Sequence, residues 1–130
     1  MLSACEKGHV NAARLLLDKG AEVDRANKYG VTPLFSACYN GHVDAARLVL
    51  DKGAEVDRAE NFGWTPLYTA CESGRVDVAR LLLDKGAEVD RATKKGTTPL
   101  AIAEERGHSS IVALLEAMME AEPWAPEGET

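Results

Sequence analysis

The chain has 130 residues, of which 45% are hydrophobic and 28% charged, a balance typical of one soluble domain. Five of its 21 acidic residues lie after residue 115 and account for most of the net charge of -6, so the preceding part is close to neutral. Such a body lacks the basic face that nucleic acids and anionic membranes require, and we expect neither as a partner. There is no apolar run of about 18 residues and no signal-peptide pattern, so we expect a cytoplasmic or nuclear protein that is not secreted.

A segment of 33 residues recurs along the chain. The tripeptide Thr-Pro-Leu begins at Thr32, Thr65 and Thr98. The run Asp-Lys-Gly-Ala-Glu-Val-Asp-Arg-Ala keeps the same step and is identical in its three copies. Because a short helical unit cannot bury its apolar face alone, repeated units must stack, and about three are needed for a stable core.

The N-terminal unit begins part-way through the repeat, so its first loop and helix cap are missing. Four of its apolar residues match positions inside the stack, and we expect them to leave an apolar face open: Leu2, Val10, Ala13 and Leu17. Two explanations stay open here. The chain is either a part of a longer parent protein, or its N-terminal face self-associates weakly.

Each complete unit contains two predicted helices. Thr32 is a suitable N-cap, and Pro33 fits the first helical position because the N–H it lacks has no partner there. Gly41 ends this helix, apolar residues at helical spacing over 43–50 predict a second one, and Gly53 closes it. The polar stretch that follows has a glycine at its turn and predicts an exposed, hairpin-like loop.

This pattern resembles the ankyrin-repeat family. The likeness rests on the 33-residue period, the Thr-Pro-Leu helix starts, Gly-Ala after the second helix, and Gly-His at 8–9, 41–42 and 107–108. It implies an all-α repeat solenoid, a stack of helix-turn-helix units joined by β-hairpin-like loops. The predicted ankyrin domain covers residues 1–121, as a truncated repeat 1–26, repeats 27–59 and 60–92, and a C-terminal capping repeat 93–121.

Two substitutions depart from the family pattern. The family usually has His after Thr-Pro-Leu, where it ties the helix start by hydrogen bonds, but Phe35, Tyr68 and Ala101 stand there. We expect aromatic packing to replace this tie, with Phe35 and Tyr68 half-buried. Arg75 follows Gly74, where the other units have His.

The last repeat is adapted to contact with water. Glu104 stands where the other units have Cys, and Glu116 where they have Leu, as expected on the outer face of a terminal repeat. We expect the last helix to continue over 117–121 and to end before Pro123. Residues 122–130 are acidic and contain prolines, which predicts a flexible tail, with Trp124 either free or folded back on the final repeat.

The reactive side chains predict no catalysis, no cofactor and no metal site. Cys5, Cys38 and Cys71 lie one repeat apart, about 8–10 Å if units pack as neighbouring helices do, whereas a disulfide needs Cα atoms within about 7 Å. We expect buried, reduced thiols. The histidines are also a repeat apart, too far to share a metal ion, and no carboxylate is placed to orient His108 beside Ser109.

The loop tips and first-helix ends vary between units, while segments 38–59 and 71–92 share 17 of 22 residues. In ankyrin proteins these variable parts form a concave recognition face, which the resemblance implies here as well. Tyr29, Phe62 and Trp64 are the expected anchors because aromatic residues are enriched at interface hot spots. The predicted partner-binding residues are Lys28, Tyr29, Val31, Tyr39, Asn61, Phe62, Trp64, Glu72, Lys94 and Lys95.

We therefore expect a module that binds a protein or peptide partner and is not an enzyme. Its aromatic centre and basic end suit an extended or acidic segment. The alternative is a structural repeat array, or an engineered consensus-like scaffold, without a native partner. Exposed rings at Tyr29, Phe62 and Trp64 favour binding, whereas rings buried against each other favour the structural alternative.

Overall fold

The computed structural model describes residues 1–120, which form eight α-helices and no β-strand. The predicted tail 122–130, with Trp124, lies outside the described residues. The helices are α1 (Leu2–Glu6), α2 (Val10–Asp18), α3 (Pro33–Tyr39), α4 (Val43–Asp51), α5 (Pro66–Ser73), α6 (Val76–Asp84), α7 (Pro99–Glu105) and α8 (Ser109–Glu120).

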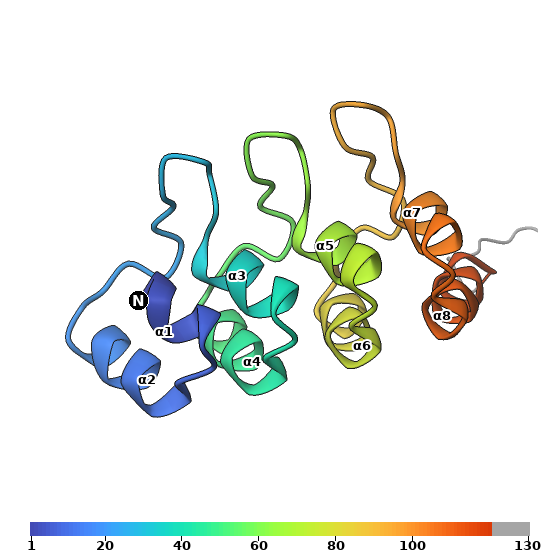
Figure 1. The fold of residues 1–130 in the computed structure, drawn as a ribbon. Helices are drawn as coiled ribbons and strands as arrows, with labels where there is room; N and C mark the ends of the chain where they lie inside the picture. The colour runs from blue at the N-terminus through green and yellow to red at the C-terminus, as the bar shows by residue number, and fades with distance from the viewer. Residues whose placement is uncertain (121–130) are drawn as a thin grey trace, which may run out of the picture.

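The helices form four antiparallel pairs that stack in a row, from α1 and α2 at the N-terminal end to α7 and α8 (Figure 1). The first helices of successive pairs pack on one another, and so do the second helices. Three long loops join the pairs and project from the same side of the row (Figure 1). The predicted all-α repeat solenoid is confirmed, while the exact boundaries of the repeats stay a prediction.

The predicted N-caps explain where the first helices begin. In α3, α5 and α7 a threonine hydroxyl accepts a hydrogen bond from the backbone N–H three residues later, and proline occupies the first turn. The oxygen-to-nitrogen distances are 3.2 Å for Thr32 and Phe35, 3.1 Å for Thr65 and Tyr68, and 3.1 Å for Thr98 and Ala101. The start of each helix is therefore determined locally.

The junction between consecutive pairs depends on a glycine and on the residue that packs over it. Gly41 has a φ of +77°, and a Cβ there would lie 2.9 Å from the Arg75 side chain. Arg75 Nε donates to the Tyr39 carbonyl at 3.3 Å, and His108 Nε2 donates to the Glu72 carbonyl at 3.1 Å. Arg75 thus forms the same junction as His108, and its departure from the family pattern preserves the contact.

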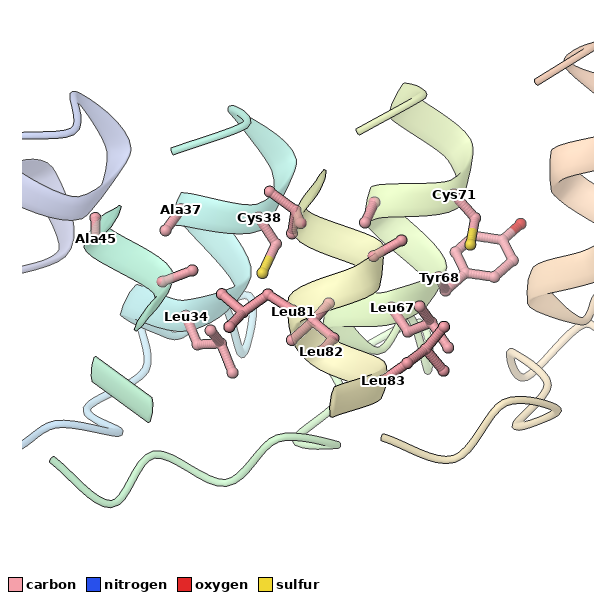
Figure 2. Packing of buried hydrophobic residues seen from close by; sticks show 14 of the residues in the cluster. Leu34, Ala37, Cys38, Ala45, Leu67, Tyr68, Cys71, Leu81, Leu82 and Leu83 are labelled. Carbon is pink, nitrogen blue, oxygen red and sulfur yellow. The ribbon is translucent and has the colours of Figure 1, made fainter. Parts of the chain in front are cut away.

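The core runs through the interior of the row. Figure 2 shows how leucine, alanine and cysteine side chains from α3, α5 and α6 fill the space between neighbouring helices. Phe35 and Tyr68 are buried, so the expectation that they are half-buried is wrong. Neighbouring first helices pack closely here, α5 against α3 and α7 against α5, and the Trp64 ring lies against that of Tyr68.

The open N-terminal face differs from the one expected. Ala13 is fully buried because it lies on the side of α2 that faces the core, and Leu2, Val10 and Leu17 are partly buried. The large exposed residues are Leu15 and Leu16, which the sequence analysis missed. Leu15 is 58% exposed, whereas its equivalent Leu48 is 5% exposed because α2 packs over α4.

At the other end of the row, carboxylates stand at two positions where the inner repeats have apolar residues. Glu104 of α7 and Glu116 of α8 are both exposed, while the cysteines at the position of Glu104 are fully buried. Met119 of α8 is also exposed, so this end presents carboxylates beside an apolar side chain, whereas α2 presents two leucines.

Candidate binding groove

A groove of about 780 Å³ lies along the face formed by the loops and the first helices. Six of the ten predicted partner-binding residues line it: Val31, Tyr39, Phe62, Trp64, Lys94 and Lys95. The other lining residues are Glu6, Phe35, Ser36, Asn40, Glu60, Tyr68, Thr93 and Thr97. Sequence comparison could have identified Glu6, because it occupies the same repeat position as Tyr39 and Glu72.

Each loop tip is held in shape by the side chain at its first position. Glu60 Oε1 accepts hydrogen bonds from the N–H groups of Phe62 at 2.8 Å and Trp64 at 2.9 Å. Asn27 does the same one repeat earlier, accepting from Tyr29 at 2.9 Å and Val31 at 3.0 Å. These bonds determine where the loop aromatics emerge, so the positions of Tyr29 and Phe62 do not depend on a ligand.

Neighbouring loops are also bonded to each other. The N–H of Asn61 donates to the Tyr29 carbonyl at 3.0 Å, and the Lys94 N–H donates to the Phe62 carbonyl at 3.1 Å. Asn61 Nδ2 donates to the Lys28 carbonyl at 3.0 Å. Asn61, predicted as a partner contact, therefore joins two loops and does not line the groove.

The predicted anchors Tyr29, Phe62 and Trp64 lie in three different settings. Phe62 is 68% exposed and Tyr39 is 50% exposed, both on the groove. Trp64 is partly buried, with its ring centroid 4.7 Å from that of Tyr68 at an interplanar angle of 59°. Tyr29 is exposed outside the groove, and the Lys28 Nζ lies 5.2 Å from its ring centroid. Trp64 thus helps to build the floor, while Phe62 and Tyr39 are available to a partner.

Glu72 has a partner within the chain. Its carboxylate lies 3.3 Å from the Arg106 guanidinium, and the Ser73 hydroxyl donates to it at 3.3 Å. It does not line the groove, although it was predicted as a partner contact. Burial, followed by the carboxylates of Glu72 and Glu105, raises the pKa of Tyr68. The phenol therefore stays neutral at physiological pH.

The cysteines are poorly suited to chemistry. All three are free and fully buried. Burial raises the pKa of Cys5 and of Cys38, and it raises the pKa of Cys71 to about 12. Because the thiolate is the reactive form, these thiols are inert in the folded protein.

Two further observations concern metals and membranes. Over residues 1–120, no three His, Cys, Asp or Glu side chains come together in a way that could hold a metal ion. In the same part of the chain, no helix has the length and apolar character that crossing a bilayer requires.

The paired helices and aligned loops define an all-helical repeat array, and a groove runs along one side of it. A family model described as ankyrin repeats (three copies) matches residues 1–60 and 55–125. The chain belongs to the ankyrin-repeat family. Proteins built from these repeats are generally protein–protein interaction modules and typically lack catalytic chemistry. A comparison with curated proteins found no significant match.

Proposed function

We propose that this protein binds a segment of another protein in the groove and catalyses no reaction. The observation that supports this best is the exposure of Phe62 and Tyr39 on a groove whose floor includes Phe35, Trp64 and Tyr68. Contiguous exposed apolar surface of this kind marks interaction sites. Aromatic side chains in a concave site are the residues that supply most binding energy in protein interfaces.

The charges in the groove favour a protein over a nucleic acid. Among residues 1–120, Lys94 and Lys95 are the basic residues that line it, and Glu6 and Glu60 line it as well. A nucleic-acid groove needs a continuous basic track along the phosphates, which these carboxylates interrupt.

The four predicted contacts outside the groove have different roles in this proposal. Lys28 and Tyr29 stand at a loop tip outside the groove, and a segment that lies within the groove would not need to touch them. Asn61 and Glu72 hold the face in shape through the loop hydrogen bonds and the ion pair with Arg106.

The proposed setting is the cytoplasm or the nucleus. Ankyrin-repeat proteins usually act inside cells. The three cysteines are free, and free thiols are usual in the reducing compartments of the cell.

Binding measurements on the unchanged chain and on two variants test the proposal. A partner is captured from a cell lysate and identified. Its Kd is then measured for the unchanged chain, for the double variant Tyr39→Ala, Phe62→Ala (the groove variant), and for the single variant Tyr29→Ala. Circular dichroism verifies that all three chains are folded. We expect the groove variant to bind at least about tenfold more weakly, because aromatic hot spots contribute about 2 kcal/mol or more each. Tyr29→Ala is the matched control, since its ring is exposed but lies outside the groove.

Two results count against the groove. If the groove variant and the unchanged chain bind the partner equally, the partner uses another surface. If no protein is captured, the structural repeat array without a native partner replaces the binding module.

We also propose that the N-terminal face is a weak self-association surface. Ala12, Leu15 and Leu16 are exposed along α2. The opposite end of the row exposes Glu104 and Glu116, so a head-to-tail contact would bury carboxylates against leucine. A contact between the same face of two copies, related by two-fold symmetry, avoids this cost.

A further inference from the structure

The groove has opposite charges at its two ends. Glu6 belongs to α1 in the first helix pair, and Lys94 and Lys95 belong to the loop that precedes α7 in the last pair. All three side chains are exposed. Within residues 1–120 none of them takes part in an ion pair. Their charges are therefore available to a ligand.

Two polar side chains between these ends form hydrogen bonds with the chain's own backbone. Glu60 accepts two backbone hydrogen bonds from its own loop, from Phe62 and Trp64. The Asn40 side-chain amide donates to the Ser36 carbonyl at 2.8 Å. The middle of the groove thus offers mainly the aromatic surfaces of Tyr39 and Phe62.

We infer that the groove binds an extended peptide that has a basic residue near Glu6, apolar residues in its middle and an acidic residue near Lys94 and Lys95. This inference rests on the proposed function and specifies the ligand of the same groove. The middle of the peptide would place apolar side chains on Tyr39 and Phe62. Complementary charges at the ends give the peptide one direction along the groove.

The length of the array sets the spacing of the two charges on the peptide. Glu6 and Lys94 are separated by almost three repeats, which is about 24–30 Å at a helix-packing distance of about 8–10 Å per repeat. An extended chain advances about 3.3–3.6 Å per residue, so the basic and acidic residues of the peptide lie on the order of eight positions apart.

A single-stranded nucleic acid is the competing ligand, since bases also stack on aromatic rings. It fits less well, because phosphates along the whole strand would pass Glu6 and Glu60. The peptide meets each charged end with a side chain of opposite sign, and meets the aromatic surfaces of Tyr39 and Phe62 with apolar side chains.

Peptide selection tests the inference. A phage-displayed library of random peptides of about twelve residues, long enough to span both ends, is selected on the immobilised protein. The expected pool has apolar residues in the middle, Asp or Glu toward one end and Lys or Arg about eight positions away. The dissociation constant of the most enriched peptide is then measured by fluorescence anisotropy, beside that of an oligothymidine of similar length.

Charge exchange locates the acidic end. We expect the double variant Lys94→Glu, Lys95→Glu to bind the selected peptide about tenfold more weakly. A peptide with Lys in place of its acidic residue should restore binding to that variant. Lys28→Glu is the matched control, because Lys28 does not line the groove, and it should leave the affinity within about twofold.

The outcomes separate the inference from the proposed function. An enriched pool without opposite charges at its ends, or failure of the exchanged peptide to restore binding, overturns the inference. If Tyr39→Ala, Phe62→Ala nevertheless weakens binding, the groove proposal stands. If the same peptides are enriched on that variant, the groove proposal fails as well. Tighter binding of the oligothymidine than of any selected peptide overturns both.

Discussion

Two buried threonines four residues apart use their hydroxyl groups differently. Thr65 Oγ1 caps α5 by accepting from the Tyr68 N–H at 3.1 Å. Thr69 Oγ1 is also buried, but it has no hydrogen-bond partner among the described residues. A buried hydroxyl without a partner destabilises the folded state, whereas a capping hydroxyl stabilises the helix start.

Replacing each threonine by valine separates these two effects. We expect Thr65→Val to lower the free energy of unfolding by about 1 kcal/mol, because a backbone N–H at the start of α5 loses its acceptor. We expect Thr69→Val to leave it unchanged or raise it, because valine has nearly the same shape and no hydroxyl to desolvate. Urea unfolding followed by circular dichroism measures both. Equal losses in the two variants would show that the hydroxyl of Thr69 has a partner.

The cysteines predict how stability depends on pH. Burial raises the pKa of Cys38, and it raises the pKa of Cys71 to about 12, whereas an unfolded cysteine has a pKa of about 8.5. Above about pH 8.5 the thiols of the unfolded chain lose protons that the folded chain keeps, so the free energy of unfolding falls as pH rises. For each thiol, the free energy of unfolding falls by about 1.4 kcal/mol per pH unit, from about pH 8.5 up to the pKa of that thiol in the folded chain.

The check is urea unfolding at several pH values between 8 and about 10, within the range where unfolded thiols ionise. The matched variant Cys38→Ala, Cys71→Ala should lose stability less steeply with pH, because the remaining titrating groups are unchanged. If both chains show the same slope, the thiols are not the cause. Slow labelling of the folded chain by a thiol reagent, accelerated by urea, is expected from the same burial.

Among the helices, α2 and α4 have almost the same sequence but different surroundings. Leu15 in α2 and Leu48 in α4 are equivalent leucines, one mostly exposed and one buried under α2. We expect Leu48→Ala to lower the free energy of unfolding by about 2–5 kcal/mol, the range for buried leucines. Leu15→Ala should change it by about 0.5 kcal/mol or less.

Each of these two variants is the control for the other, because both remove the same atoms from the same position of a helix. Urea unfolding at low protein concentration makes the comparison without a contribution from self-association. A large loss in Leu15→Ala under those conditions would mean that the residue is buried in solution, in contradiction to its exposure in the monomer.

The same helices show how much the sequence could predict. The caps and ends of α3 and α5 follow from neighbouring residues, so Thr32, Pro33 and Gly41 predicted them correctly. In α2, Ala13 is buried and Leu15 is exposed. This difference depends on which helices pack on α2, and the repeat pattern alone does not contain that information.

The groove could be predicted only in part for the same reason. Variation between loops and between first-helix ends pointed to Phe62, Lys94 and Tyr39, which line it. It also pointed to Asn61 and Glu72, which are bonded to Lys28 and Arg106 within the chain. A variable residue is either free for a partner or paired with another variable residue, and only the three-dimensional contacts distinguish the two.

For the molecule as a whole, the row of helix pairs ends in two faces of unlike chemistry. We expect the protein to form a weak dimer through Leu15 and Leu16, which sedimentation equilibrium would detect as a rise in average mass with concentration. The double variant Leu15→Lys, Leu16→Lys should stay monomeric, because the lysines of one copy would face the lysines of the other across the two-fold axis and repel them.

Tyr29→Lys is the matched control for the dimer, since Tyr29 is as exposed as Leu15 but lies on the loop between α2 and α3 and not on α2 itself. It should dimerise like the unchanged chain. A dimer that survives the double lysine substitution would place the contact on another surface, and the groove would be the first candidate because its aromatic rings are exposed. A dimer lost in Tyr39→Ala, Phe62→Ala would then mean that self-association and partner binding compete for one face.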